Sequence, residues 1–334
     1  MGEKVKVSEA DFIEDLARRI LAHNPAPVIR YRLLRDVLHL SLANSEVVKA
    51  KGGLDESPHV RMLGAEQRLD GSWGRFHSRD SSVRHRIPTT EVGIERALAL
   101  GLDASHPILK RAVDYLSEIL DGRADFPDPP EKNERWAFGV RLFTAALLAW
   151  VAPQMPILDS EWRLWAEVVC YTFMDGEYNP RAELFALRKQ TGLKDAGFLR
   201  LANKYHLMVL SIKEDEMPPR VLSALLKWIW QRETGIGYLG QPLYQLPPNR
   251  SPAALNAWFA TLELLSHFSG WHEVAGKAIA WLWSQRDESG FWDFGPLPSN
   301  STVLPLSDTW RMKMARKLDW TVRTLVLLRR FYPG

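Results

Sequence analysis

Apolar residues recur along this chain at helical spacing, and no run alternates in the manner of a β-strand. The pattern predicts an all-α protein built from two interleaved sets of helices. The first set covers roughly residues 8–22, 57–67, 106–120, 159–174, 218–231 and 271–286. The second set, whose members each follow one of the first, covers roughly residues 26–40, 88–101, 134–151, 196–212, 252–268 and 318–331.

Five helices of the first set end in a polar turn that contains glycine, and these turns are nearly evenly spaced. Three of them are alike: Gln67–Trp73 (Q-R-L-D-G-S-W), Gln285–Trp292 (Q-R-D-E-S-G-F-W) and Gln231–Tyr238 (Q-R-E-T-G-I-G-Y). Weaker versions lie at residues 121–122 and 175–176. We expect each glycine to adopt the left-handed conformation that ends a helix, and the spacing indicates an internal repeat.

The second set is the more uniformly apolar, for example at 138–151 and 253–268, which indicates burial on most sides. Six buried helices surrounded by six others predict an (α/α)6 toroid. Residues 1–334 would form this single domain, with 1–55 as its N-terminal helical portion and 56–334 as the repeats. The long connections are 68–87, 175–195, 232–251 and 287–317. They would share one rim, where the N-termini of the inner helices favour an anion.

Composition restricts the function without defining it. The chain has 334 residues, 46% of them hydrophobic and 25% charged, with a net charge of +3, so a nucleic-acid partner is not expected. The single cysteine, Cys170, excludes an intrachain disulfide and a multi-cysteine zinc site, and we expect no metal or other cofactor. The uncharged run 142–158 is short for a membrane span. We therefore expect a cytoplasmic protein and leave peripheral membrane contact open.

The motif Q-x(3–4)-G-x-W occurs twice, at Gln67, Gly71 and Trp73 and at Gln285, Gly290 and Trp292. In this respect the chain resembles the squalene–hopene cyclase and prenyltransferase repeat superfamily, over roughly residues 55–331. The resemblance implies the α/α toroid. The D-x-D-D acid motif of the cyclases is absent, and the nearest acids lie in D-F-P-D-P at 125–129. The zinc ligands of the prenyltransferases are also absent, because Val168 stands two residues before Cys170.

The segment 305–321, where the last long connection leads into the last helix, carries basic and aromatic residues, namely Trp310, Arg311, Lys313, Arg316, Lys317 and Trp320. Cations beside aromatic rings predict a clamp for a diphosphate, a carboxylate or a sugar, and the alternative is a solvated basic segment. Asp319 is a candidate proton donor in the helix that follows. A carboxylate on an apolar helix either has a raised pKa or forms a structural ion pair, here with Arg323.

The connection 76–91 and the one after it contribute further candidates. His85 and Arg86, near the titratable His77, would bind an anion. Glu91 would be a general acid if burial raises its pKa, and otherwise it stabilises the helix dipole. Asp128 lies near other acids, as glycoside hydrolysis requires, but a proline-rich turn explains the same residues without catalysis.

These residues favour a terpene cyclase- or prenyltransferase-like protein. It would bind a hydrophobic, isoprenoid-type small molecule with a diphosphate or carboxylate end, and Asp319, Glu91 or Asp128 would donate a proton. Trp136 and Trp258 would line the apolar site, or else belong to the core. Two alternatives stay open: a carbohydrate-active enzyme (glycoside hydrolase or lyase) on the same toroid, and a non-catalytic binding or scaffold protein.

Overall fold

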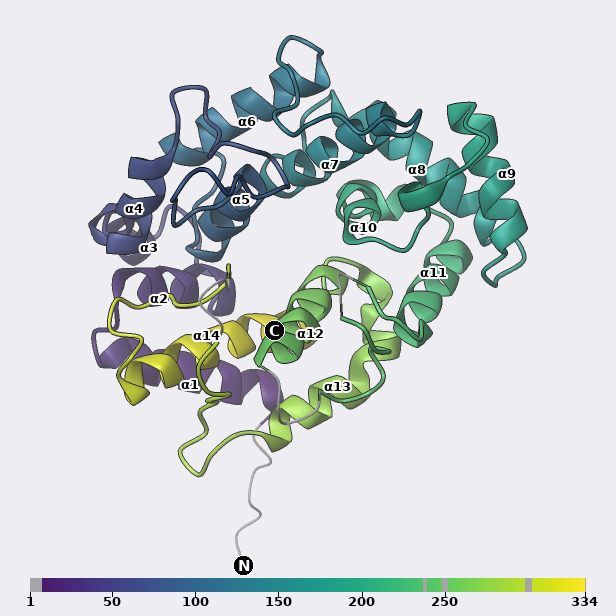
Figure 1. Cartoon of the computed structure of the whole chain (residues 1–334). Helices are drawn as coiled ribbons and strands as arrows, with labels where there is room; N and C mark the ends of the chain where they lie inside the picture. The colour runs from purple at the N-terminus through teal and green to yellow at the C-terminus, as the bar shows by residue number, and fades with distance from the viewer. Residues whose placement is uncertain (1–7, 237–238, 248–251, 298–301, 334) are drawn as a thin grey trace, which may run out of the picture. The chain divides into compact units, whose positions relative to one another are not determined.

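The computed structural model describes residues 8–236, 239–247, 252–297 and 302–333 (Figure 1). Over these residues the chain has fourteen α-helices and no β-strand, which confirms the all-α prediction. The first predicted set appears close to its expected bounds, as α1 (Glu9–Ala22), α4 (Pro58–Glu66), α6 (Pro107–Leu120), α8 (Leu158–Thr172), α11 (Pro219–Gln231) and α13 (His272–Ser284). The second set appears as α2 (Pro27–Arg32), α5 (Thr90–Ala99), α7 (Trp136–Val151), α10 (Lys204–Leu210), α12 (Pro252–Leu265) and α14 (Lys313–Phe331).

Two further helices, α3 (Ser45–Gly52) and α9 (Pro180–Thr191), are not predicted by the apolar pattern. α9 occupies most of 175–195, which the pattern treats as a loop. The side chain of Asn179 caps it by accepting hydrogen bonds from two backbone N–H groups, and Gly192 ends it. α10 begins later than expected, because Asn203 caps it in the same way. The spacing of apolar residues does not reveal a helix N-terminus that is set by one asparagine side chain.

The structure confirms the predicted conformation of the five turn glycines. The backbone angle φ is 92° at Gly71, 70° at Gly122, 87° at Gly176, 60° at Gly235 and 86° at Gly290. Each of these glycines donates its N–H to the carbonyl three residues earlier. A Cβ at position 71 would lie 2.2 Å from a carbonyl oxygen of α6, so a side chain cannot fit there. Tyr238, the aromatic residue expected after the turn at Gly235, lies outside the described residues.

The turn hydrogen bonds correct the alignment of the two best motifs. The same backbone bond closes both turns, spanning Arg68–Ser72 in one and Asp287–Phe291 in the other. In this alignment Gln67 corresponds to Arg286. Gln285, which the sequence motif pairs with Gln67, lies one position too early and is exposed. The two turns therefore share one backbone geometry, but the glutamine stands at the equivalent position in only one of them.

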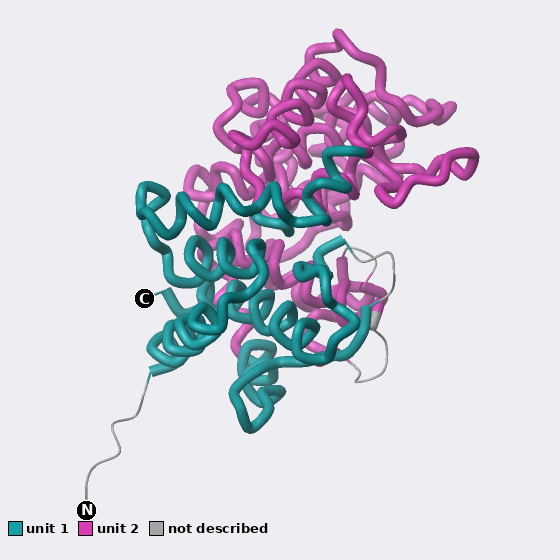
Figure 2. Tube along the Cα trace, turned by 90° about the vertical axis from the view of Figure 1, so that its left-hand side faces the viewer, with its two compact units in different colours: residues 1–65, 99–101, 277–334 teal, residues 66–98, 102–276 magenta. Residues whose placement is uncertain are grey.

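The chain divides into two compact units, coloured separately in Figure 2. Unit 1 contains residues 1–65, 99–101 and 277–334, and unit 2 contains 66–98 and 102–276. In unit 1, α14 packs against α1 and α2. Every residue of α14 from 319 to 329 is buried, so this helix forms the centre of the unit's core.

In unit 2, α10 packs against α7, α8 and α12, and α6 packs against α7. α7 is buried without interruption from Thr144 to Ala149, which is burial on all sides over more than one turn. All seven residues of α10 except the first are buried. The second-set helices of this unit are thus core helices, as their apolar composition predicts. A polar side chain at the start of α10 consequently lies where water is scarce.

Candidate functional site

Gln67 anchors the connection between α4 and α5. Its amide donates to the carbonyl oxygens of Gly71 at 2.9 Å and Ile108 at 2.8 Å. Its own carbonyl oxygen accepts from the guanidinium of Arg111. Gln67 therefore joins its own turn to the first turns of α6, which is the backbone-bonding role that the motif predicts.

Trp73 attaches the same connection to α5. The tryptophan is 2% exposed, and its ring is so close to Gly93 that a Cβ there would lie 2.4 Å from it. The backbone N–H of Trp73 donates to Oγ1 of Thr90 at 3.0 Å. Because Thr90 is the first residue of α5, the connection is held directly beside Glu91, the second residue of that helix.

Asp128 shapes the middle of this connection. The buried carboxylate accepts three backbone N–H groups in succession, from Phe76 at 2.5 Å, His77 at 3.0 Å and Ser78 at 2.7 Å. In this geometry Asp128 holds the chain at His77 in place, and it is not arranged to donate a proton.

Glu91 lies at the centre of a five-residue cluster. Its Oε2 is 2.8 Å from Nδ1 of His77, and its Oε1 accepts from the Tyr205 hydroxyl at 2.9 Å. Nζ of Lys204 is 2.8 Å from the same Oε1 and 2.7 Å from Oε1 of Glu95. The Tyr205 hydroxyl also lies 3.0 Å from Nδ1 of His77. The cluster thus combines the loop before α5, the first turns of α5 and the start of α10.

The charges of the cluster are set by its contacts. Burial alone would raise the pKa of Glu91, but the hydrogen bond from His77 and the charge of Lys204 outweigh burial and lower the pKa to about 2. The hydrogen bond to Glu91 raises the pKa of His77, against the opposing effect of burial. Burial would lower the pKa of Lys204, but Glu95 and Glu91 raise it. Glu91 is therefore a carboxylate at neutral pH, and it supports a protonated His77.

The hydrogen bonds of this cluster reach the His77 ring at Nδ1 alone. Its side chain is 38% exposed, and Nε2 makes no hydrogen bond within the described part of the chain. The ring of Phe143 stacks on it, with centroids 5.6 Å apart and planes 9° apart. Phe198 and Tyr205 pack against Phe143 in turn. His77 therefore presents one free nitrogen beside an aromatic surface, while its other nitrogen is fixed by Glu91.

Trp136, of the remaining candidates in unit 2, lies nearest this site along the aromatic contacts. It packs edge-on against Phe126, which contacts Phe76. His85 and Arg86 are both exposed, and the backbone N–H of Arg86 donates to Glu66. Trp258 is fully buried in α12, which places it in the core. Glu91, Asp128 and Trp136 thus belong to one neighbourhood, around residues 76–78.

The candidates in unit 1 form a different arrangement. Asp319 is fully buried, and its Oδ2 accepts backbone N–H groups from Leu306 at 2.7 Å and Ser307 at 3.1 Å. Trp320 is also buried, with Nε1 donating to the carbonyl of Gly295 at 2.8 Å. Both residues hold connections against α14.

The basic residues proposed as an anion clamp lie at the start of α14. Arg311 and Lys313 are exposed, and Trp310 is half-buried. Arg316 and Lys317, which follow them, form ion pairs with Asp293 and Asp287. The two exposed cations therefore lie next to paired ones.

Tyr205 and Lys204 were not identified from the sequence. They follow Glu91 by more than a hundred positions, and α10 does not begin where periodicity predicts. The only local signal is the segment Asn203–Lys204–Tyr205, in which a capping residue precedes polar side chains at the entry to a buried helix. A long-range contact of this kind is visible only once the helices are packed.

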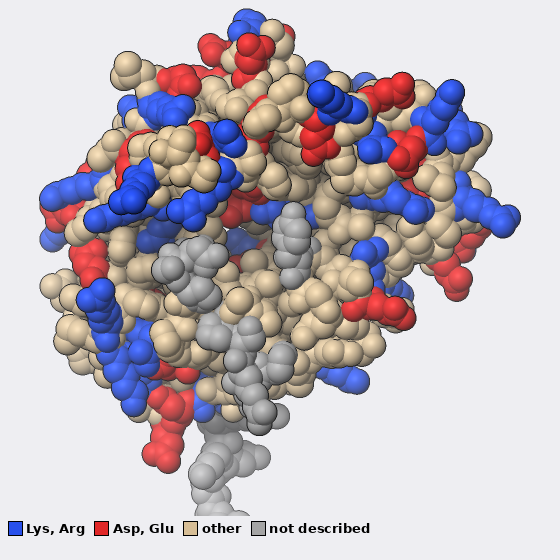
Figure 3. Space-filling view, in the orientation of Figure 1, with Lys and Arg blue, Asp and Glu red and all other residues tan. Residues whose placement is uncertain are grey.

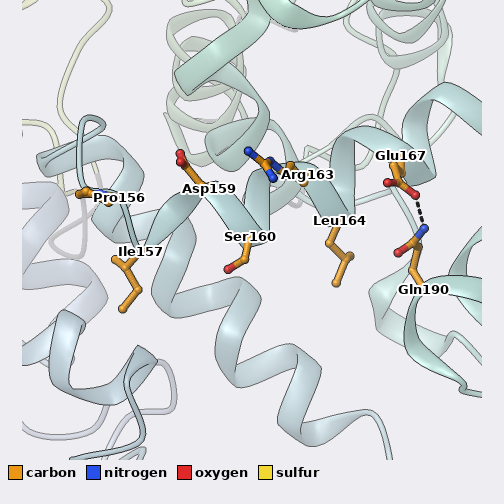
Figure 4. A pocket seen from close by; sticks show the side chains of 8 residues that line it. All are labelled: Pro156, Ile157, Asp159, Ser160, Arg163, Leu164, Glu167 and Gln190. Carbon is orange, nitrogen blue, oxygen red and sulfur yellow. Dashed lines mark hydrogen bonds between the residues drawn. The ribbon is translucent and has the colours of Figure 1, made fainter.

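A shallow groove in unit 2, about 620 Å³ in volume, runs between α8 and α9 (Figure 4). Arg163, Asp159 and Glu167 line it, and Glu167 accepts a hydrogen bond from Gln190 across it. None of the sequence-predicted site residues lies there. Acids and bases are mixed in the groove and more widely over the surface seen in Figure 3, so neither has one dominant sign of charge.

Comparisons with known proteins return no relatives. No family model matches the chain, and no curated protein and no solved structure matches it either. Within the described residues, no helix has the length and apolar character needed to cross a bilayer.

Proposed function

We propose that this chain is an (α/α)6 toroid related to the squalene–hopene cyclase and prenyltransferase superfamily, and that it is an enzyme acting on a hydrophobic, isoprenoid-type substrate with an anionic end. The regular glycine turns and the Gln67 anchor support the fold. The aromatic rings around His77 support an apolar substrate. The observation that carries the catalytic part is the His77–Glu91 pair, in which one ring nitrogen is fixed and the other is free.

In this proposal His77 transfers protons through Nε2. Glu91 accepts the hydrogen bond from Nδ1–H, fixes the tautomer, and stabilises the imidazolium that forms when Nε2 takes up a proton. The Tyr205 hydroxyl and Lys204 hold the Glu91 carboxylate in position. A carboxylate–histidine pair of this kind suits removal of the proton from an acceptor hydroxyl, as the hydroxyl oxygen bonds to the prenyl carbon and the diphosphate leaves with the electrons of the broken C–O bond.

The same geometry favours group transfer over cyclisation initiated by an acid. Protonating an unactivated double bond requires a strong, neutral acid. Glu91 is held ionised, and the carboxylates of Asp128 and Asp319 are used to accept backbone N–H groups. Glycoside hydrolysis would require a second carboxyl group free to act on a sugar. The carboxylate of Asp128 instead accepts the backbone N–H groups of residues 76–78.

The test is to incubate the protein with prenyl diphosphates plus hydroxyl and aromatic acceptors, with triterpenes, and with oligosaccharides, and to identify products by mass spectrometry. We expect product from the isoprenoid set alone. His77→Gln should lower turnover by roughly 10²-fold or more, and His85→Gln, an exposed histidine of the same connection, should not. Turnover that survives His77→Gln would reject the catalytic assignment. Absence of both turnover and binding would reject the substrate class.

A further inference from the structure

One face of α9 in unit 2 carries side chains that the fold does not bury. α9 packs against α8 (Figure 1), and its buried residues are Glu183, Ala186 and Leu187. After Pro180, its exposed residues are Arg181, Leu184, Phe185, Arg188 and Lys189. These five are three or four positions apart along the helix, so they lie on one face.

The middle of this face is apolar. Leu184 is 41% exposed and Phe185 is 61% exposed. The ring of Phe185 meets the ring of Tyr171 from α8 edge-on, with centroids 6.3 Å apart. Most of the Phe185 ring is therefore open to solvent, although a side chain of this type is usually buried.

The charged side chains around this apolar centre are all basic. Arg181 lies one turn before Phe185 and Arg188 one turn after it, and the side chains of both arginines make no hydrogen bond or ion pair within the described part of the chain. Nζ of Lys189 donates to the Tyr171 hydroxyl at 2.9 Å. The one acid of α9, Glu183, is buried and pairs with Arg200.

The exposed acids near α9 leave this excess of positive charge in place. Glu167 of α8 accepts a hydrogen bond from Gln190, on the side of the groove between the two helices. Asp175 and Glu177 precede α9, in the turn that joins it to α8. The exposed face of α9 is therefore a small apolar centre between cations.

This arrangement fits an anionic lipid surface better than a protein partner. Helices that lie in the membrane interface place apolar side chains beside Lys and Arg, and each cation adds attraction to an anionic leaflet. A stable protein interface takes about 20–30 residues from each partner. One face of a helix of twelve residues is too small to supply them.

We propose that α9 binds unit 2 to anionic membranes. Leu184 and Phe185 enter the interface between head groups and acyl chains, while Arg181, Arg188 and Lys189 contact the head groups. The side chains are already exposed, so binding requires no change of fold. The proposal does not depend on the proposed function, and His77→Gln should keep full membrane binding.

Flotation of the full chain with vesicles tests the proposal. We expect binding to vesicles of phosphatidylcholine mixed with phosphatidylserine, and little binding to phosphatidylcholine alone. Binding to the mixed vesicles should weaken as salt is raised, because salt screens exposed charges.

Two pairs of variants locate the contact. Arg181→Gln/Arg188→Gln should weaken binding to mixed vesicles about thirtyfold, because two cations near the lipid are lost. Lys49→Gln/Lys110→Gln removes two exposed cations elsewhere and should have little effect. Phe185→Ser should weaken binding severalfold, whereas Val48→Ser, at a side chain of α3 that is 56% exposed, should not. Circular dichroism checks that each variant is folded.

Three outcomes would overturn the proposal. Equal losses in the two double variants would show that net charge alone attracts the vesicles. Equal binding to both kinds of vesicle, or none to either at millimolar lipid, would remove the role of the anionic head groups. Binding of soluble polyglutamate without binding of vesicles would identify the α9 face as a site for an acidic protein instead.

Discussion

The turn that contains Trp73 in unit 2 and the turn that contains Trp292 in unit 1 have the same backbone hydrogen bonds, but different side chains lie beside them. In unit 2 the N–H of Trp73 donates to Oγ1 of Thr90, and in unit 1 the N–H of Trp292 donates to Oγ1 of Thr321, both at 3.0 Å. The residue after Thr90 is Glu91, whereas the residue after Thr321 is the buried Val322. The turn is therefore an architectural device, and the candidate chemistry comes from one carboxylate added beside it.

The anchors of the two turns differ as well. Gln67 bonds two carbonyl groups and Arg111 in unit 2. Within the described residues, its counterpart Arg286 donates only to the carbonyl of Trp283 in its own helix, at 2.9 Å, and places its guanidinium over the rings of Phe12 and Trp283, 4.9 and 4.6 Å from their centroids. Hydrogen bonding and cation–π packing thus stabilise equivalent turns. A repeat can keep its backbone geometry while the residue that secures it changes.

If the two turns are equivalent in architecture, their tryptophans should contribute equally to stability. Both are almost completely buried. We expect Trp73→Ala and Trp292→Ala each to lower the free energy of unfolding by about 3–5 kcal/mol through loss of packing. Urea unfolding followed by circular dichroism measures this, with the half-exposed Trp310→Ala as a control of small effect. A large loss of stability in one variant and none in the other would show that the two turns are not equivalent.

Acid should destabilise unit 2 more than unit 1, because unit 2 contains the fully buried His206. Burial lowers the pKa of His206 to about 3, from 6.5, so the unfolded chain binds this proton first. The stability that His206 contributes is complete above pH 6.5 and is lost as the pH falls towards 3, by at most about 1.4 kcal/mol per pH unit. The raised pKa of His77 acts above pH 6.5 and does not oppose this loss.

Native-state hydrogen exchange at pH 6 and pH 5 would measure this effect unit by unit. We expect protection to fall in α10 more than in α14. His206→Leu removes the titrating group and should abolish the difference. Equal losses of protection in both helices would show that the acid response does not originate at His206.

The contact between Trp73 and Gly93 has no glycine counterpart in unit 1, where position 324 is threonine. A Cβ at position 93 would lie 2.4 Å from the indole. Gly93→Ala should therefore destabilise the chain by about 1–3 kcal/mol through overpacking. Thermal unfolding monitors it, and Gly276→Ala, where a Cβ meets nothing within 4 Å, is the control. A neutral Gly93→Ala would mean that the tryptophan can move aside.

The smallest expected loss of stability comes from the two threonines that accept the tryptophan N–H groups, and it should be the same in both units. Thr90→Val and Thr321→Val each remove the acceptor of a tryptophan N–H while keeping the side-chain volume. Each also removes the hydroxyl's own donation to a backbone carbonyl, of Gly74 in one turn and of Lys317 in the other. Both should cost about 1 kcal/mol in the free energy of unfolding. Values that differ by much more than this would indicate that one turn depends on its threonine and the other does not.

These contrasts show what sequence reasoning can reach. The helices ended by turn glycines are predictable, because an apolar period and a glycine conformation are local properties. α9 is missed because Asn179 starts it and its apolar face is narrow. Asp128 is found as a candidate, but its role as an acceptor for residues 76–78 depends on a contact across fifty positions. Tyr205 is missed for the same reason, since chain packing alone brings it to Glu91.

Glu91 fixes the His77 ring through Nδ1 and raises its pKa, and nuclear magnetic resonance titration of the His77 ring tests this most directly. In the unmodified chain the pKa of His77 should lie above 6.5, with the proton on Nδ1 held by the carboxylate. In Glu91→Gln the pKa of His77 should fall, because the hydrogen bond and the negative charge that raise it are lost. A His77 pKa that is the same in both proteins would contradict the account.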